Sequence, residues 1–72
     1  MNVAKIKASE LQPGMIYVEP MRLDWNGDTY AREITKVEHS KLNHPDGGKY
    51  VMIWCGVREI RMSSEKDVTV QA

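Results

Sequence analysis

Hydrophobic and polar residues alternate along most of the chain, and glycine and proline interrupt the alternation at intervals. Apolar residues at every second position predict β-strands, because successive side chains of a strand point to opposite faces. The segments between the interruptions are rich in Val, Ile, Tyr and Thr, which fit a pleated sheet better than a helix. The pattern therefore predicts an all-β fold.

Five strands follow from this pattern. They are Met15–Leu23, Thr29–His39, Lys49–Cys55, Arg58–Met62 and Asp67–Gln71. One short helical turn is predicted before them at residues 9–11, because Ser9 is a residue type that caps free amides. Asn26-Gly27 predicts a tight hairpin turn with positive φ at both residues, and Gly56-Val57 predicts a second tight turn. The polar segment 40–48 contains Pro45 and two glycines, so we expect a mobile loop there.

The second predicted strand has an irregular pattern. Its apolar residues Ala31, Ile34 and Val37 are three positions apart. A bulge or sharp bend near residues 34–36 would bring them onto one face, as the long strands of small barrels require. A helix across residues 31–40 is the alternative, but the β-branched residues in this segment favour a strand.

The third predicted strand is apolar on both of its faces. One row consists of Val51, Ile53 and Cys55, and the other consists of Tyr50, Met52 and Trp54. A chain of 72 residues buries only a modest share of its surface and has core enough for one of these rows. The second row is therefore a candidate contact surface, since aromatic residues and Met are enriched in protein interfaces.

We expect this second row to form a protein-binding surface, and homodimerisation through it is the simplest version. The expected binding residues are Trp25, Tyr50, Met52 and Trp54, with Arg58 at the rim. In the alternative interpretation the row is a second small core, covered by a loop or by the N-terminal arm at residues 3–7.

Charge gives a second candidate function. Ten Lys and Arg balance ten Asp and Glu, so no global field draws the chain to nucleic acid or to acidic membranes. A local basic stripe with nearby tyrosines would still suit single-stranded nucleic acid. Its residues would be Arg22, Arg32, Arg58 and Arg61. Glutamates alternate with these bases, however, and ordinary charge balancing of solvated strands explains the same pattern.

Few residues carry chemistry that would suit a metal or a catalytic site. The candidates are His39, His44, Asp46 and Cys55, and their spacing matches no common zinc pattern. We therefore expect no metal, no cofactor, no small-molecule substrate and no enzymatic activity. The single cysteine agrees with a reducing compartment, and the chain has no signal-peptide or membrane-spanning stretch, so we expect one cytoplasmic domain over residues 1–72.

The order of strands, turns and loops is that of a small SH3-like barrel with one short N-terminal helical turn. Segments 9–15, 27–30, 37–39 and 45–51 resemble the N-terminal barrel of elongation factor P and other translation-type SH3-like domains. In that family the loop before the third strand presents a modifiable lysine, whereas Asp46 stands at the corresponding place here. The resemblance thus implies the fold but not the family's function.

The chain is also similar in style to small proteins encoded by bacteriophages of actinobacteria. This similarity implies a phage-encoded protein that acts on a host protein in the host cytoplasm. The function predicted from the sequence is a non-catalytic protein interaction module, and the alternative is a nucleic-acid-binding small barrel.

Overall fold

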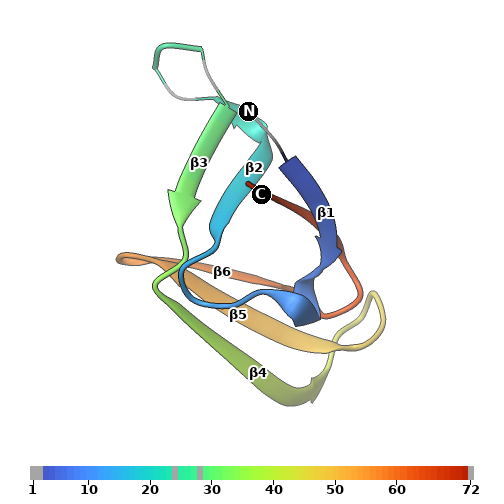
Figure 1. The fold of residues 1–72 in the computed structure, drawn as a ribbon. Coiled ribbons are helices and arrows are strands. Elements are labelled where there is room, and N and C mark those ends of the chain that lie inside the picture. The colour runs from blue at the N-terminus through green and yellow to red at the C-terminus, as the bar shows by residue number, and fades with distance from the viewer. Residues whose placement is uncertain (1–2, 24, 28, 72) are drawn as a thin grey trace.

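The computed structural model describes residues 3–23, 25–27 and 29–71, and it confirms that the chain is all-β (Figure 1). The strands are β1 (Val3–Lys7), β2 (Ile16–Leu23), β3 (Thr29–Glu33), β4 (Lys36–Asn43), β5 (Lys49–Cys55), β6 (Arg58–Ser63) and β7 (Asp67–Gln71). The 3-10 helix η1 (Ala8–Glu10) follows β1 and corresponds to the predicted helical turn. Within the described ranges no helix is long and apolar enough to cross a membrane.

The strands form two antiparallel sheets. The four-stranded sheet has the order β1-β7-β2-β3, and the three-stranded sheet has the order β4-β5-β6. The strands of one sheet run across those of the other in Figure 1, and both sheets contribute residues to one core. The most deeply buried side chains of this core are Leu11, Ile34, Val51 and Ile53. The two sheets do not close into a single barrel, so the predicted five-stranded SH3-like barrel is not confirmed.

The N-terminal arm at residues 3–7 is a strand that the prediction lacked. β1 pairs with β7 over its whole length, from Val3 opposite Gln71 to Lys7 opposite Asp67. Ala4 and Ile6 pack partly buried against the core, while Lys5 and Lys7, which alternate with them, are exposed. This strand lies in the four-stranded sheet, so it does not cover the outer row of β5; of the two covers that the alternative interpretation allowed, the N-terminal arm is therefore excluded.

The predicted long second strand is divided between the two sheets at Ile34 and Thr35. The Ile34 side chain is completely buried, and its backbone N–H donates to the Met15 carbonyl at 2.8 Å beside the start of β2. The next amide, that of Thr35, donates to the Trp54 carbonyl at 2.7 Å in the other sheet. The chain thus changes sheets within two residues, which confirms the predicted bend and explains the spacing of three that also fits a helix.

Two turn predictions need correction. β4 continues to Asn43, because a register shift between His39 and Asn43 lets it keep pairing with β5, and the predicted loop shrinks to residues 44–48. In the β2–β3 hairpin the last pair is Leu23–Thr29, which leaves residues 24–28 between the strands rather than a two-residue turn. Gly27 has φ of 85°, but no described non-glycine residue, Asn26 included, has positive φ. The Gly56 turn is confirmed, with φ of 68°.

Candidate protein interface

The two rows of β5 differ strongly in burial. On the inner row Val51, Ile53 and Cys55 are 1%, 0% and 5% exposed, and all three belong to the core between the sheets. The outer row, Tyr50, Met52 and Trp54, is only half-buried. Figure 1 shows β1, β2 and β3 on one side of the three-stranded sheet and no strand on the other side. The outer row therefore lies on a sheet face that no described strand covers.

Strand register places charged residues on both sides of this row. Lys36 of β4 and Glu59 of β6 both lie opposite Trp54. Directly opposite residues of antiparallel strands share a face, so these three side chains form one line across the sheet. Glu38, Met52 and Arg61 form the next line in the same way. We refer to the face made by these two lines together with Tyr50 as the outer face.

The charges of the outer face are paired along each edge strand. Lys36 Nζ lies 3.0 Å from Glu38 Oε1, and Arg61 Nε lies 2.7 Å from Glu59 Oε1. The hydrogen bond that Arg61 donates to Glu59 raises the pKa of the Arg61 guanidinium, which is charged at any physiological pH in either case. Lys36 also places its ammonium 4.8 Å from the centre of the Trp54 ring, within the range of a cation–π contact. The apolar centre is thus bordered by charges of both signs.

One end of the outer face is hollowed into a groove of about 320 Å³. Its lining consists of Ser40, Leu42, Tyr50, Met52 and Arg61. Leu42 on β4 is 70% exposed, and the prediction did not include it because the segment was read as a loop. The His44 ring lies 4.5 Å from the Tyr50 ring, centre to centre, and covers part of that side chain. The face therefore combines a half-buried aromatic row with an exposed leucine.

Two predicted binding residues lie elsewhere. Trp25 is 94% exposed in the β2–β3 hairpin, which belongs to the four-stranded sheet and projects away from the other sheet in Figure 1. Arg58 lies opposite Cys55 and so on the inner side of β6, where its guanidinium lies 3.1 Å from Glu19 of β2. The residues that border the outer face instead are Glu59 and Arg61, which lie opposite Trp54 and Met52.

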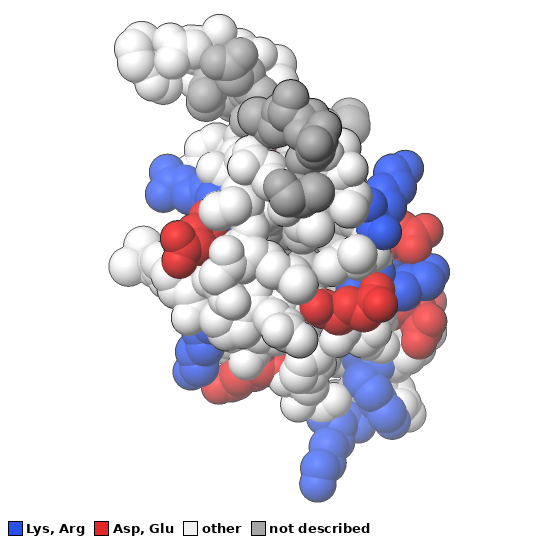
Figure 2. All heavy atoms as spheres, viewed as in Figure 1, with Lys and Arg blue, Asp and Glu red and all other residues white. Residues whose placement is uncertain are grey.

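The arginines of the nucleic-acid alternative are not gathered on one strand or face. The Arg22 side chain lies outside the described part of the structure. Arg32 is on β3 and stacks on the Tyr30 ring at 4.9 Å, whereas Arg58 and Arg61 point to opposite sides of β6. Arg58 and Arg61 each face a glutamate, at 3.1 and 2.7 Å. Figure 2 shows acidic and basic side chains interspersed over the visible face rather than a basic stripe.

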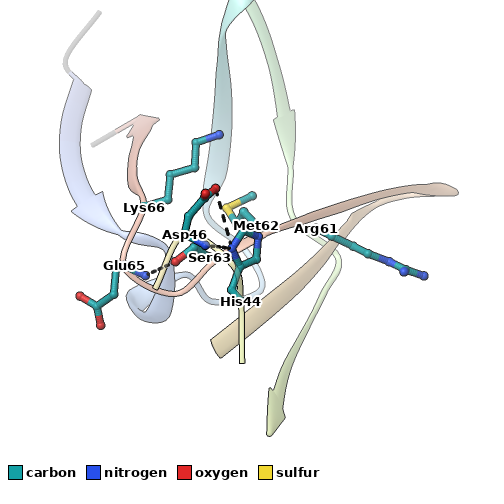
Figure 3. Close-up of a pocket in the computed structure, with 7 residues that line it drawn as sticks. All are labelled: His44, Asp46, Arg61, Met62, Ser63, Glu65 and Lys66. Atoms are coloured by element: carbon teal, nitrogen blue, oxygen red, sulfur yellow. Dashed lines mark hydrogen bonds and ion pairs between the residues drawn. The ribbon is translucent and has the colours of Figure 1, made fainter. Parts of the chain in front are cut away.

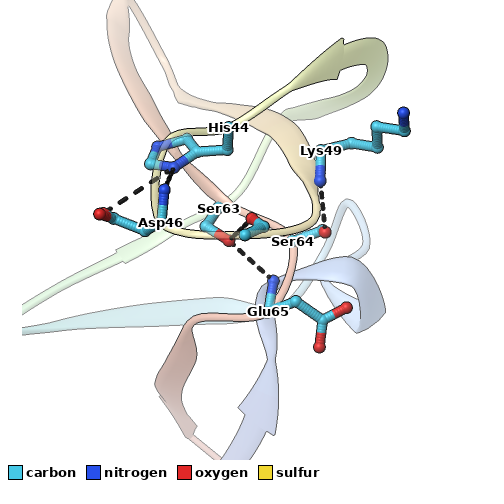
Figure 4. A network of polar contacts seen from close by, with 7 residues as sticks. His44, Asp46, Lys49, Ser63, Ser64 and Glu65 are labelled. Atoms are coloured by element: carbon cyan, nitrogen blue, oxygen red, sulfur yellow. Dashed lines mark hydrogen bonds and ion pairs between the residues drawn. The ribbon is translucent and has the colours of Figure 1, made fainter.

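A second, more polar pocket of about 370 Å³ lies where the 44–48 turn meets the β6–β7 turn (Figure 3). The Ser63 hydroxyl donates to the Gly47 carbonyl and accepts a hydrogen bond from the Glu65 amide at 3.1 Å (Figure 4). His44 Nδ1 accepts a hydrogen bond from the Asp46 amide at 3.0 Å. An accepting Nδ1 carries no proton, so the approach of the Asp46 carboxylate at 3.8 Å is not an ion pair. These bonds hold one turn against the other, and none joins Ser63 to His44.

The residues considered for metal or thiol chemistry lie apart. His39 is exposed on β4, and among the described residues no group of three or more His, Cys, Asp and Glu side chains is close enough to hold a metal ion. Cys55 is buried in the inner row. Burial raises the pKa of its thiol, the charge of Glu19 raises it further, and Arg32 opposes the shift. A buried thiol with a raised pKa is a weak nucleophile at neutral pH.

Comparison with protein-family models, with curated proteins and with solved structures finds no match.

Proposed function

We propose that the chain is a non-catalytic protein interaction module that binds its partner through the outer face of the three-stranded sheet. The supporting observation is the row Tyr50, Met52 and Trp54, which remains half-buried on a face that no strand of the described residues covers. Rigid aromatic side chains with a charged border are typical of the centre and rim of protein interfaces. A flat protein surface fits such a face better than a small ligand, because the groove beside Leu42 is about half open to solvent.

We also propose that the two sheets are an opened variant of the SH3-like barrel. In this interpretation β3 and β4 are halves of one bent strand that joins the sheets at Ile34 and Thr35. The support is the order of pairing, in which the two halves pair with β2 and β5 respectively and β7 returns to β2. The additional strand β1 extends the four-stranded sheet beyond β7.

A photo-cross-linking amino acid placed at position 52 tests the binding surface. Expressed in its native host, the chain should form a cross-link from position 52 to a protein identified by mass spectrometry, and nuclease treatment should not remove it. The matched control carries the same group at position 25, which is fully accessible but remote, and should yield no such product. Trp54→Ala, combined with the group at position 52, should reduce the yield several-fold, because a central aromatic residue carries much of the affinity of an interface.

Cross-links to nucleic acid from position 52, or cross-links to protein from position 25 alone, would contradict this proposal. Binding of single-stranded oligonucleotide at low salt that Arg61→Ala weakens would favour the nucleic-acid alternative, because phosphate contacts dominate such affinity.

A further inference from the structure

The charges on the outer face have a regular arrangement. In the first line across the sheet the order is Lys36, Trp54, Glu59, which is positive, apolar, negative. In the second line the order is Glu38, Met52, Arg61, which is negative, apolar, positive. The four charged residues therefore form the corners of a square. Neighbouring corners have opposite charges, and diagonal corners have like charges.

This arrangement is complementary to itself under a two-fold rotation. One such axis lies in the plane between two facing copies and runs parallel to β5. Rotation about it places β4 of one copy opposite β6 of the other, and each line of one copy faces the same line of the other. Lys36 then faces Glu59 of the second copy, and Glu38 faces Arg61 of the second copy. An axis perpendicular to β5 in the same plane exchanges the lines instead, and Lys36 then faces Glu38 of the second copy. Both rotations leave opposite charges in contact and apolar residues against one another.

We infer that the partner of the outer face is a second copy of this chain, packed sheet on sheet about a two-fold axis. This inference rests on the proposed function and specifies the occupant of the same surface. Closed two-fold dimers are the commonest homo-oligomers, and their interface must be self-complementary, as this face is. Two stacked sheets lie about 10 Å apart, a separation that long Lys, Arg and Glu side chains at the border span while the apolar row fills the centre.

The size of the face limits the affinity. Three strands about 4.8 Å apart and seven residues of about 3.3 Å give a face roughly 14 Å by 23 Å. Such a face buries less area than a standard specific interface and falls among weak, transient ones. We therefore expect a dissociation constant in the micromolar range, with the monomer folded on its own because its inner row is already buried.

Charge-reversed pairs of variants test the inference without depending on which axis applies. In the acidic variant, Lys36→Glu is combined with Arg61→Glu, so all four border residues are negative. In the basic variant, Glu38→Lys is combined with Glu59→Lys, so all four are positive. Each variant alone should be monomeric in analytical ultracentrifugation from about 10 µM to about 1 mM, because like charges face each other. An equimolar mixture should form a one-to-one heterodimer with an affinity at least equal to that of the unmodified homodimer.

The control makes the same change of net charge away from the outer face. Lys5→Glu combined with Lys66→Glu alters two exposed lysines, on β1 and in the β6–β7 turn, and should dimerise like the unmodified chain. Trp54→Ala should weaken self-association at least tenfold. Circular dichroism and thermal unfolding identify any variant that fails to fold. A single reversal then replaces the double one: Arg61→Glu mixed with Glu38→Lys tests the axis parallel to β5, and Lys36→Glu mixed with Glu38→Lys tests the perpendicular axis.

An unmodified chain that stays monomeric over this range overturns the homodimer. Folded charge-reversed variants that do not combine overturn it as well. If the unmodified chain is monomeric while position 52 still cross-links to a different protein in a Trp54-dependent manner, the proposed function stands and only the second copy is rejected. If position 52 forms no protein cross-link of any kind, both fail.

Discussion

The inner and outer rows of β5 alternate residue by residue, yet they have different environments. Ile53 is completely buried between the sheets, whereas its neighbours Met52 and Trp54 remain half-exposed on the far side. Both rows are apolar, so hydrophobicity alone does not separate them. What separates them is the opposite layer, since the inner row meets the four-stranded sheet and the outer row is bordered by charges on β4 and β6. An apolar side chain is thus a core residue only where a second layer exists to receive it.

The largest expected effect comes from truncating the inner row. Ile53→Ala leaves a cavity where the side chain is fully enclosed, and such changes cost about 2–5 kcal/mol. A chain of 72 residues has a total stability of the same order, so this variant should be largely unfolded at 37 °C. Urea denaturation followed by circular dichroism measures the loss.

Met52→Ala is the matched control on the outer row. At concentrations where the chain is monomeric, it should cost about 1 kcal/mol or less, because the side chain is already partly solvated. A cost as large as that of Ile53→Ala would show that the outer row is a second core, and the distinction between the rows would be lost.

The next largest loss of stability is expected at the start of β5, where the register of the strand assigns each residue to the inner or the outer row. Gly48, with φ of 64°, directly precedes β5, and a Cβ there would overlap the Ser64 hydroxyl and approach the Glu65 side chain. Gly48→Ala should therefore cost about 2–3 kcal/mol, of which about 1–2 kcal/mol is the strain of a left-handed backbone. The clash with Ser64 accounts for the remainder of the cost, because the Ser64 hydroxyl also accepts a hydrogen bond from the Lys49 amide at 2.9 Å.

Gly47→Ala provides the comparison. This residue also has positive φ, at 103°, but a Cβ there would meet no atom within 4 Å. It should therefore lose only the strain contribution, as measured by the difference in urea midpoint. Equal losses for the two variants would mean that the contact with Ser64 does not help to position the start of β5.

Much of this comparison was predictable from alternation. Residues 49–55 and 67–71 have the predicted bounds, and the assignment of Val51, Ile53 and Cys55 to the core is correct, because period-two patterns report which face a side chain occupies. The same alternation along residues 58–62 predicts that Glu59 and Arg61 point outward and that Arg58 points inward. The assignment of Arg58 to the rim overlooked that alternation, and the structure accordingly places Arg58 against Glu19.

Other features depend on contacts between segments far apart in the sequence. The strand at residues 3–7 has only two apolar residues on its core-facing side, Ala4 and Ile6, so its pairing with β7 becomes evident only once β7 offers an unpaired edge. The extension of β4 to Asn43 depends on a register shift against β5 that local polarity hides. The division of the second strand was visible in the spacing of Ala31, Ile34 and Val37, but the two separate sheets that result from it were not.

The smallest expected effect is a pH dependence of the free energy of unfolding, which arises because the inner row ends in the Cys55 thiol. Burial raises the pKa of Cys55 above its usual value of 9.0. The protonated thiol is favoured in the fold, so its contribution to stability is intact below the unfolded-state pKa and disappears as the pH rises through the folded-state pKa.

The free energy of unfolding should fall above pH 9, and Cys55 should contribute a slope of at most about 1.4 kcal/mol per pH unit. Cys55→Val, which does not titrate, should keep a flatter profile up to the pH where Tyr17, whose pKa in the fold is also raised by burial, begins to ionise in the unfolded chain. Urea denaturation between pH 7 and pH 10 compares the two profiles, and identical curves would mean that water reaches the thiol and that the end of the inner row is as open as the outer one.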